Sequence, residues 1–71
     1  MNSELSDMEK LAHLLEHWQG HNQDHVSNYR DWAERAEAEG NTKAAALLRQ
    51  AAETTETVTE LFAQAKKALE D

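Results

Sequence analysis

A chain of 71 residues without cysteine has room for one small domain and excludes disulfide bonds and thiolate metal sites. Its net charge of -7 at pH 7 argues against nucleic acid and anionic lipid as partners, because both require a basic surface. No apolar run approaches the roughly 20 residues that span a bilayer, and the polar residues 1–10 do not resemble a signal peptide. We therefore expect a cytoplasmic protein that contacts no membrane.

The composition predicts an all-α protein. The chain contains no proline and only two glycines, so few positions interrupt a helix. Strong helix formers dominate, and no stretch alternates apolar and polar residues as a half-buried strand does. One helical domain is expected over residues 1–71.

The first predicted helix covers about residues 4–39 and begins at Ser3 or Ser6. Ser6 and Glu9 have the spacing of a capping box, in which each side chain binds a free backbone N–H of the other residue. Gly20 lies inside this helix, where glycine costs about 1 kcal/mol relative to alanine. One continuous helix is favoured because the apolar stripe keeps its phase through Gly20, and a three-helix bundle broken at Gly20 is the alternative.

The clearest break in the chain follows the first helix, at Gly40 and Asn41. Glycine suits the left-handed residue that closes a helix, and Asn41 or Thr42 can cap the next one. The second predicted helix therefore covers residues 42–70.

An apolar stripe runs along each predicted helix, and the short connection makes the two helices antiparallel neighbours. Facing residues should have numbers that sum to about 81, an estimate from the position of the turn. Trp18 should then meet Ala63, and Trp32 should meet Arg49. One hairpin covers only part of its stripes, so a homodimeric four-helix bundle or a partner protein is expected. The predicted interaction surface comprises Trp18, Tyr29, Trp32 and Phe62.

Four histidines follow one another at intervals of four residues along the first helix. Two imidazoles at positions i and i+4 can bind one metal ion. The predicted ligands are His17, His21 and His25, and an all-imidazole site suits a divalent transition metal such as nickel or zinc. Because protonated imidazole cannot bind, metal binding should fail below about pH 6.5. The alternative is that these histidines are solvated and have no ligand.

A polar residue falls near the centre of the first apolar stripe. The antiparallel alignment places Thr55 and Thr59 roughly opposite Asn22. A buried polar layer of Asn22, Thr55 and Thr59 with His25 either fixes the register of the helices or orients metal-binding imidazoles from behind.

The segment from His13 to His25 resembles a small uncharacterised helical domain of prokaryotes with the pattern LLEHWxxHNxxH, followed here by Tyr29 and by Trp32 and Ala33. The resemblance extends loosely to the second helix. Such domains occur alone or fused to small proteins linked to nickel handling. The resemblance implies a metal-related role for four positions: His17, His21, Asn22 and His25.

Two functions remain open from the sequence. The first is a small metal-binding protein with an accessory or sensor role. The second is a structural helical hairpin that dimerises or docks another protein without metal. No catalytic residues are predicted, because the chain shows no nucleophile with a base, no pair of acids in a cleft and no phosphate-binding loop.

Overall fold

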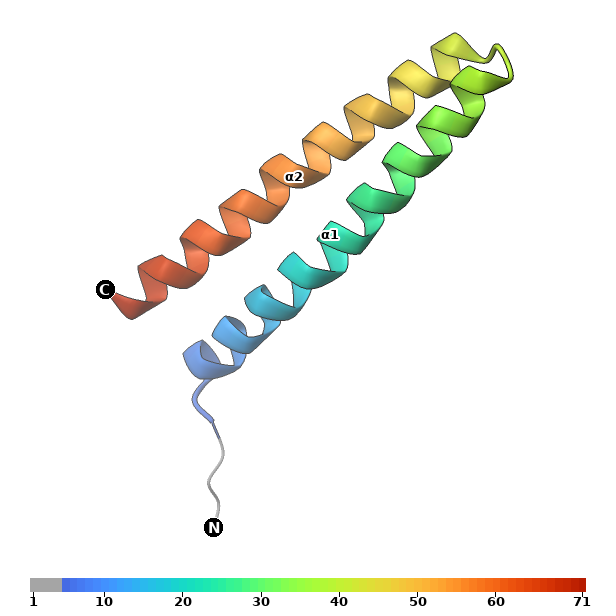
Figure 1. The fold of residues 1–71 in the computed structure, drawn as a ribbon. Coiled ribbons are helices and arrows are strands. Elements are labelled where there is room, and N and C mark those ends of the chain that lie inside the picture. The colour runs from blue at the N-terminus through green and yellow to red at the C-terminus, as the bar shows by residue number, and fades with distance from the viewer. Residues whose placement is uncertain (1–4) are drawn as a thin grey trace.

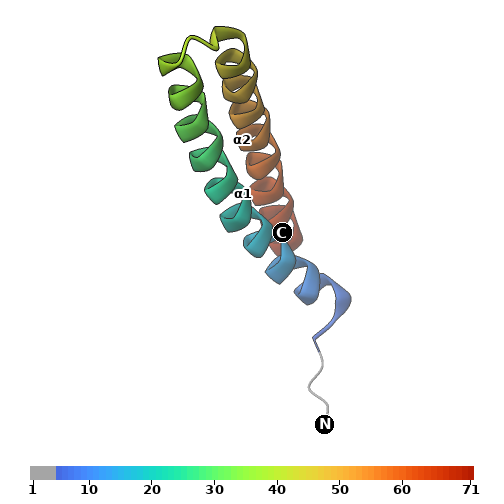
Figure 2. The same ribbon diagram turned by 90° about the vertical axis from the view of Figure 1, so that its right-hand side faces the viewer.

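The computed structural model describes residues 5–71 and shows two long helices joined by a tight turn. Helix α1 spans Asp7–Ala38 and α2 spans Thr42–Glu70. The helices run antiparallel side by side, and the first turns of α1 extend past the C-terminal end of α2 (Figures 1 and 2). The predicted all-α hairpin is confirmed. A helix start at Ser3 lies outside the described residues.

Ser6 determines where α1 begins. Its hydroxyl accepts a hydrogen bond from the backbone N–H of Glu9 at 3.1 Å, and its own N–H donates to the Glu9 carboxylate at 2.9 Å. The predicted capping box is therefore formed, and the helix starts at Asp7 rather than at residue 4. The backbone hydrogen bond from Ser6 lowers the pKa of Glu9, so the contribution of the Glu9 carboxylate to the cap is fully present above the ordinary carboxyl pKa and is lost as the pH falls through the lowered value.

Gly40 closes α1. Its φ of 88° lies in the left-handed region that favours glycine. In this conformation Gly40 donates its N–H to the Glu37 carbonyl at 2.9 Å, and Asn41 donates to the Ala36 carbonyl at 2.8 Å. Asn41 occupies the cap position of α2, although its side chain makes no capping hydrogen bond. The predicted break is confirmed.

The two helices meet along a seam, and on each helix its positions follow one another at alternating spacings of three and four residues. On α1 its buried and half-buried positions are Ala12, Leu15, Gln19, Asn22, Val26, Tyr29, Ala33 and Ala36. On α2 they are Ala45, Leu48, Ala52, Thr55, Thr59, Phe62 and Lys66. Three seam alanines, at positions 33, 45 and 52, are fully buried, so the backbones approach closely where their side chains are smallest. We call these fifteen positions the seam.

Among residues 5–71, three ion pairs join the helices. Two hydrogen bonds, of 2.8 and 3.3 Å, connect Arg30 to Glu56. Arg49 pairs with Glu37, and Lys66 pairs with Glu16 at 3.0 Å. The residue numbers sum to 82 for the lysine pair and to 86 for both arginine pairs, so the register differs by up to five residues from the expected 81.

The Lys66 ammonium lowers the pKa of Glu16 through its hydrogen bond and its charge. The contribution of this ion pair to stability is therefore present above the ordinary carboxyl pKa and disappears as the pH falls through the lowered value. Because Glu16 is well exposed, the contribution is small and screened by salt.

Gly20 does not interrupt α1, so the three-helix alternative is wrong. The seam continues in phase from Leu15 through Gln19 and Asn22 to Val26, and its packing on α2 holds the glycine in a helical conformation.

Replacing Gly20 with alanine should stabilise the protein. An added Cβ meets nothing within 4 Å, and alanine is favoured over glycine in a helix by about 0.5–1 kcal/mol. Urea unfolding followed by circular dichroism should show a higher midpoint with an unchanged slope. An equal or lower midpoint would mean that the helix is not continuous at Gly20 in solution.

Among the described residues, neither helix is long and apolar enough to cross a membrane.

Candidate functional site

Two histidines on successive turns of α1 form the candidate site. The Nε2 atoms of His21 and His25 lie 3.0 Å apart, which is a hydrogen bond from one imidazole to the other. Their rings are nearly perpendicular, at 87°, with centroids 4.5 Å apart. The Nε2 atoms of both rings therefore point toward the same place. A metal ion, which accepts an electron pair from each nitrogen, can replace the proton that the two nitrogens share.

Two further rings extend the pair into a column along α1. His17 stacks on His21 at 6.1 Å with an interplanar angle of 20°. Tyr29 stacks on His25 at 5.8 Å with an angle of 13°. His17 and His21 are exposed, whereas Tyr29 is half-buried in the seam and His25 is half-buried beside it. The column is therefore anchored at the Tyr29 end and open to solvent at the His17 end.

The three predicted metal ligands do not converge on one point. Within residues 5–71 no group of three or more His, Cys, Asp or Glu side chains is close enough to hold a metal ion. The structure brings together His21 and His25 and leaves His17 stacked outside the pair. Successive histidines are displaced by about 40° around the helix, because four residues exceed one turn.

The predicted polar layer is half-buried, but its side chains do not hydrogen-bond to one another. The Thr55 hydroxyl donates to the Ala51 carbonyl and the Thr59 hydroxyl to the Thr55 carbonyl, both at 2.8 Å. In the described part of the chain no hydrogen bond joins Asn22 to either threonine or to His25, and no buried polar side-chain atom is left without a partner. The threonines thus satisfy their own helix.

The aromatic residues of the predicted interaction surface divide into two groups. Trp18 contacts Phe62 across the seam, with ring centroids 5.4 Å apart, rather than the predicted Ala63. Trp32 is 57% exposed and carries the Arg35 guanidinium over its ring at 4.5 Å. The expected contact of Trp32 with Arg49 is wrong, because Arg49 binds Glu37 on the other side of the hairpin.

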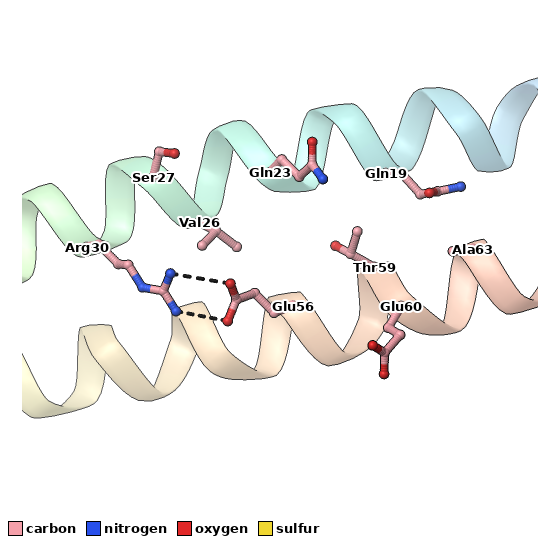
Figure 3. A pocket seen from close by; sticks show the side chains of 9 residues that line it. All are labelled: Gln19, Gln23, Val26, Ser27, Arg30, Glu56, Thr59, Glu60 and Ala63. Atoms are coloured by element: carbon pink, nitrogen blue, oxygen red, sulfur yellow. Dashed lines mark hydrogen bonds and ion pairs between the residues drawn. The ribbon is translucent and has the colours of Figure 1, made fainter.

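Sequence reasoning missed a shallow polar groove on that other side. Arg30 and Glu56 bridge it, with Gln19, Gln23 and Glu60 along its length (Figure 3). Arg30 and Glu56 are already paired across the helices. The position of the groove depends on the cross-helix register, which the sequence alone does not fix.

Comparison with known proteins identifies the family of the chain. The model of a family described as a domain of unknown function (DUF8180) matches residues 11–69, which include the His21–His25 pair and most of both helices. The chain belongs to this family. Neither the curated proteins nor the solved structures gave a match.

Proposed function

We propose that this member of the family is a small metal-binding protein that holds a divalent transition metal through His21 and His25. The observation that carries the proposal is the convergence of two Nε2 atoms at 3.0 Å. Imidazole binds zinc and similar ions at about 2.0–2.1 Å, which places two nitrogens of a tetrahedral ion roughly 3.3 Å apart. Small ring rotations therefore convert the hydrogen-bonded pair into a chelating pair.

The surroundings of the pair favour an imidazole site. Tyr29 and His17 stack on its two ends and restrict rotation of the ligand rings, which reduces the entropy lost on binding. Nitrogen ligands without thiolates suit nickel, zinc, copper or cobalt. The resemblance of residues 13–25 to domains that occur alone or fused to small proteins linked to nickel handling favours nickel within that group.

The chemistry of such a site is binding rather than catalysis. The ring column lies along one helix, and its His17 and His21 side chains are exposed to solvent. Two imidazoles leave coordination positions open for water or for further protein ligands. An accessory or sensor role, in which metal is taken up and released, fits a site of this kind.

Calorimetric titration with nickel or zinc chloride at neutral pH tests the proposal. We expect a saturable site in the natural chain and at least a tenfold loss of affinity in His21→Ala and in His25→Ala, since each loses half of the chelating pair. His13→Ala is the matched control, because His13 is exposed on the same helix and outside the pair, and it should bind as the natural chain does. Absence of heat with both metals would remove the proposal.

A second candidate is an association module that needs no metal. It is favoured by the large exposed apolar side chains, among them Trp32 at 57%, Leu47 at 60% and Leu61 at 56%. Sedimentation of the chain in the presence of a chelator separates the two candidates, because association without metal and a flat calorimetric titration together would support only the second.

A further inference from the structure

The two sides of the hairpin differ in chemistry. On both helices, the residues that immediately precede seam positions lie on one side, because the helices are antiparallel and each step turns by about 100°. We call this side the apolar face. It carries Leu14, Trp18 and Trp32 on α1 and Leu47, Val58 and Leu61 on α2, and none of its positions is Asp or Glu.

The residues that immediately follow seam positions lie on the opposite side, which we call the charged face. They supply both arginine ion pairs and the acidic member of the lysine pair. The net charge of -7 is therefore concentrated away from the apolar face, and two apolar faces can approach without bringing carboxylates together. The charged residues that show this division are Glu16, Arg30, Glu37, Arg49, Glu56 and Glu60.

The hairpin exposes more surface than a globular monomer of its mass. Its accessible area is 5421 Å², whereas about 4,500 Å² is expected for a folded monomer of 8.1 kDa. The excess of about 900 Å² is close to the roughly 800 Å² that each partner buries in a stable interface. The shortest extent of the backbone is 11 Å, the thickness of a single helix layer, whereas domains are usually built from at least two layers.

The positions of the apolar face on α1 are spaced symmetrically about residue 23, and the residue type is the same on both sides only at the histidines. Leu14 and Trp32 lie equally far from that residue, as do Trp18 and Asn28, and as do His21 and His25. Residue 23 also lies next to the midpoint of the helix Asp7–Ala38.

We infer that a second copy of the chain packs on the apolar face, antiparallel, with the two-fold axis crossing α1 at residue 23. The result is a four-helix bundle in which His21 of each copy faces the partner's His25. Four imidazoles then surround one point on the axis. This inference rests on the proposed function for the metal itself and adds the residues that complete its coordination shell.

A second copy of the chain supplies the metal ligands that the site in one chain lacks. Two imidazoles fill half of the four positions that zinc takes in closed protein sites, and the two-fold axis supplies the other half from identical residues. The packing around it is apolar, since Leu14 meets the partner's Trp32 on either side of the histidines. A metal at this point binds only the assembled dimer, so metal binding and dimerisation reinforce each other.

Light scattering and metal analysis of the full chain test the inference. We expect the dimer mass with one zinc or nickel ion for every two chains. Leu61→Glu places a charge on the apolar face at a side chain that is 56% exposed in the hairpin, so it should give a helical monomer with at least tenfold weaker metal binding. Ala63→Glu adds the same charge to the charged face of α2 and should leave the dimer and the stoichiometry unchanged.

The register has a test of its own, because the natural chain lacks cysteine. A chain carrying both Leu14→Cys and Trp32→Cys should form a covalent dimer on mild oxidation. Its two cysteines are eighteen residues and about 27 Å apart on one helix, so they cannot join within a chain. A non-covalent dimer that resists this cross-link would overturn the proposed axis.

The other outcomes separate the two proposals. A monomer that binds one ion per chain would overturn the shared site and leave metal binding through His21 and His25 intact. A dimer of the expected mass that binds neither zinc nor nickel would overturn the proposed function and the shared site together. Unchanged affinity in Leu61→Glu would also overturn the shared site, since the pair in one chain would then suffice.

Discussion

Leu15→Ala should destabilise the hairpin by about 2–5 kcal/mol, the cost of removing a buried leucine side chain and leaving a cavity. Leu15 is 4% exposed and is one of only two large apolar side chains among the buried residues of the described chain, the other being Val26. A core in a chain of this size rarely supplies more than about 3–5 kcal/mol. We therefore expect a substantial unfolded fraction at room temperature, measured by urea unfolding followed by circular dichroism.

Leu14→Ala is the matched control, because it makes the same chemical change one residue away. Leu14 is 45% exposed in the hairpin, so its loss should cost much less than that of Leu15 in dilute solution. If two apolar faces associate, the effect of Leu14→Ala should increase with protein concentration, whereas that of Leu15→Ala should be large at every concentration. Equal effects of the two changes would mean that the seam is not the core in solution.

The sequence predicts the local features of the fold well, because they depend on residues close together in the chain. The capping box of Ser6 and Glu9 and the left-handed Gly40 are both present. The predicted helix start at residue 4 is earlier than the observed one, because the sequence offers both Ser3 and Ser6 as caps and does not show which of them begins the helix. Continuity through Gly20 followed from the phase of the apolar stripe, which outweighs the low helix propensity of one glycine.

Contacts between the helices were harder to predict. A register estimated from the turn assumes ideal geometry, and the observed ion pairs depart from it by one to five residues. Because of this difference in register, Trp18 contacts Phe62, and Arg49 pairs with Glu37 instead of contacting Trp32. A shift of one residue turns a side chain by about 100° around the helix. An error of one residue in the register is therefore enough to make a predicted pair of facing residues wrong.

The candidate site shows the same division between local and long-range features. The spacing of four residues correctly brings His21 and His25 together, because that contact lies within one helix. Whether His17 joins them depends on ring rotation, and its ring stacks on His21 instead. The predicted polar layer depended on contacts across the seam. Its threonines bond within α2 instead, because each hydroxyl lies within hydrogen-bond distance of the carbonyl one turn earlier in the same helix.

Ala52→Leu should be the second severely destabilising change, by about 1–3 kcal/mol, because it forces a large side chain between closely packed backbones. Ala52 is fully buried, and the observed register places it level with Ala33, which is also fully buried. Neither residue has a flexible side chain that can move aside, so the helices themselves must separate. We expect a lower urea midpoint and a lower thermal midpoint.

Ala46→Leu distinguishes overpacking from a general effect of leucine on α2. Ala46 is exposed and immediately follows a seam position, so leucine there meets solvent and is almost as good a helix former as alanine. Its midpoint should stay close to that of the natural chain. If Ala52→Leu were as stable as Ala46→Leu, the helices would have to be loosely packed at the centre of the seam. The close approach of the two backbones, which places the apolar residues of both helices on one face, would then not exist in solution.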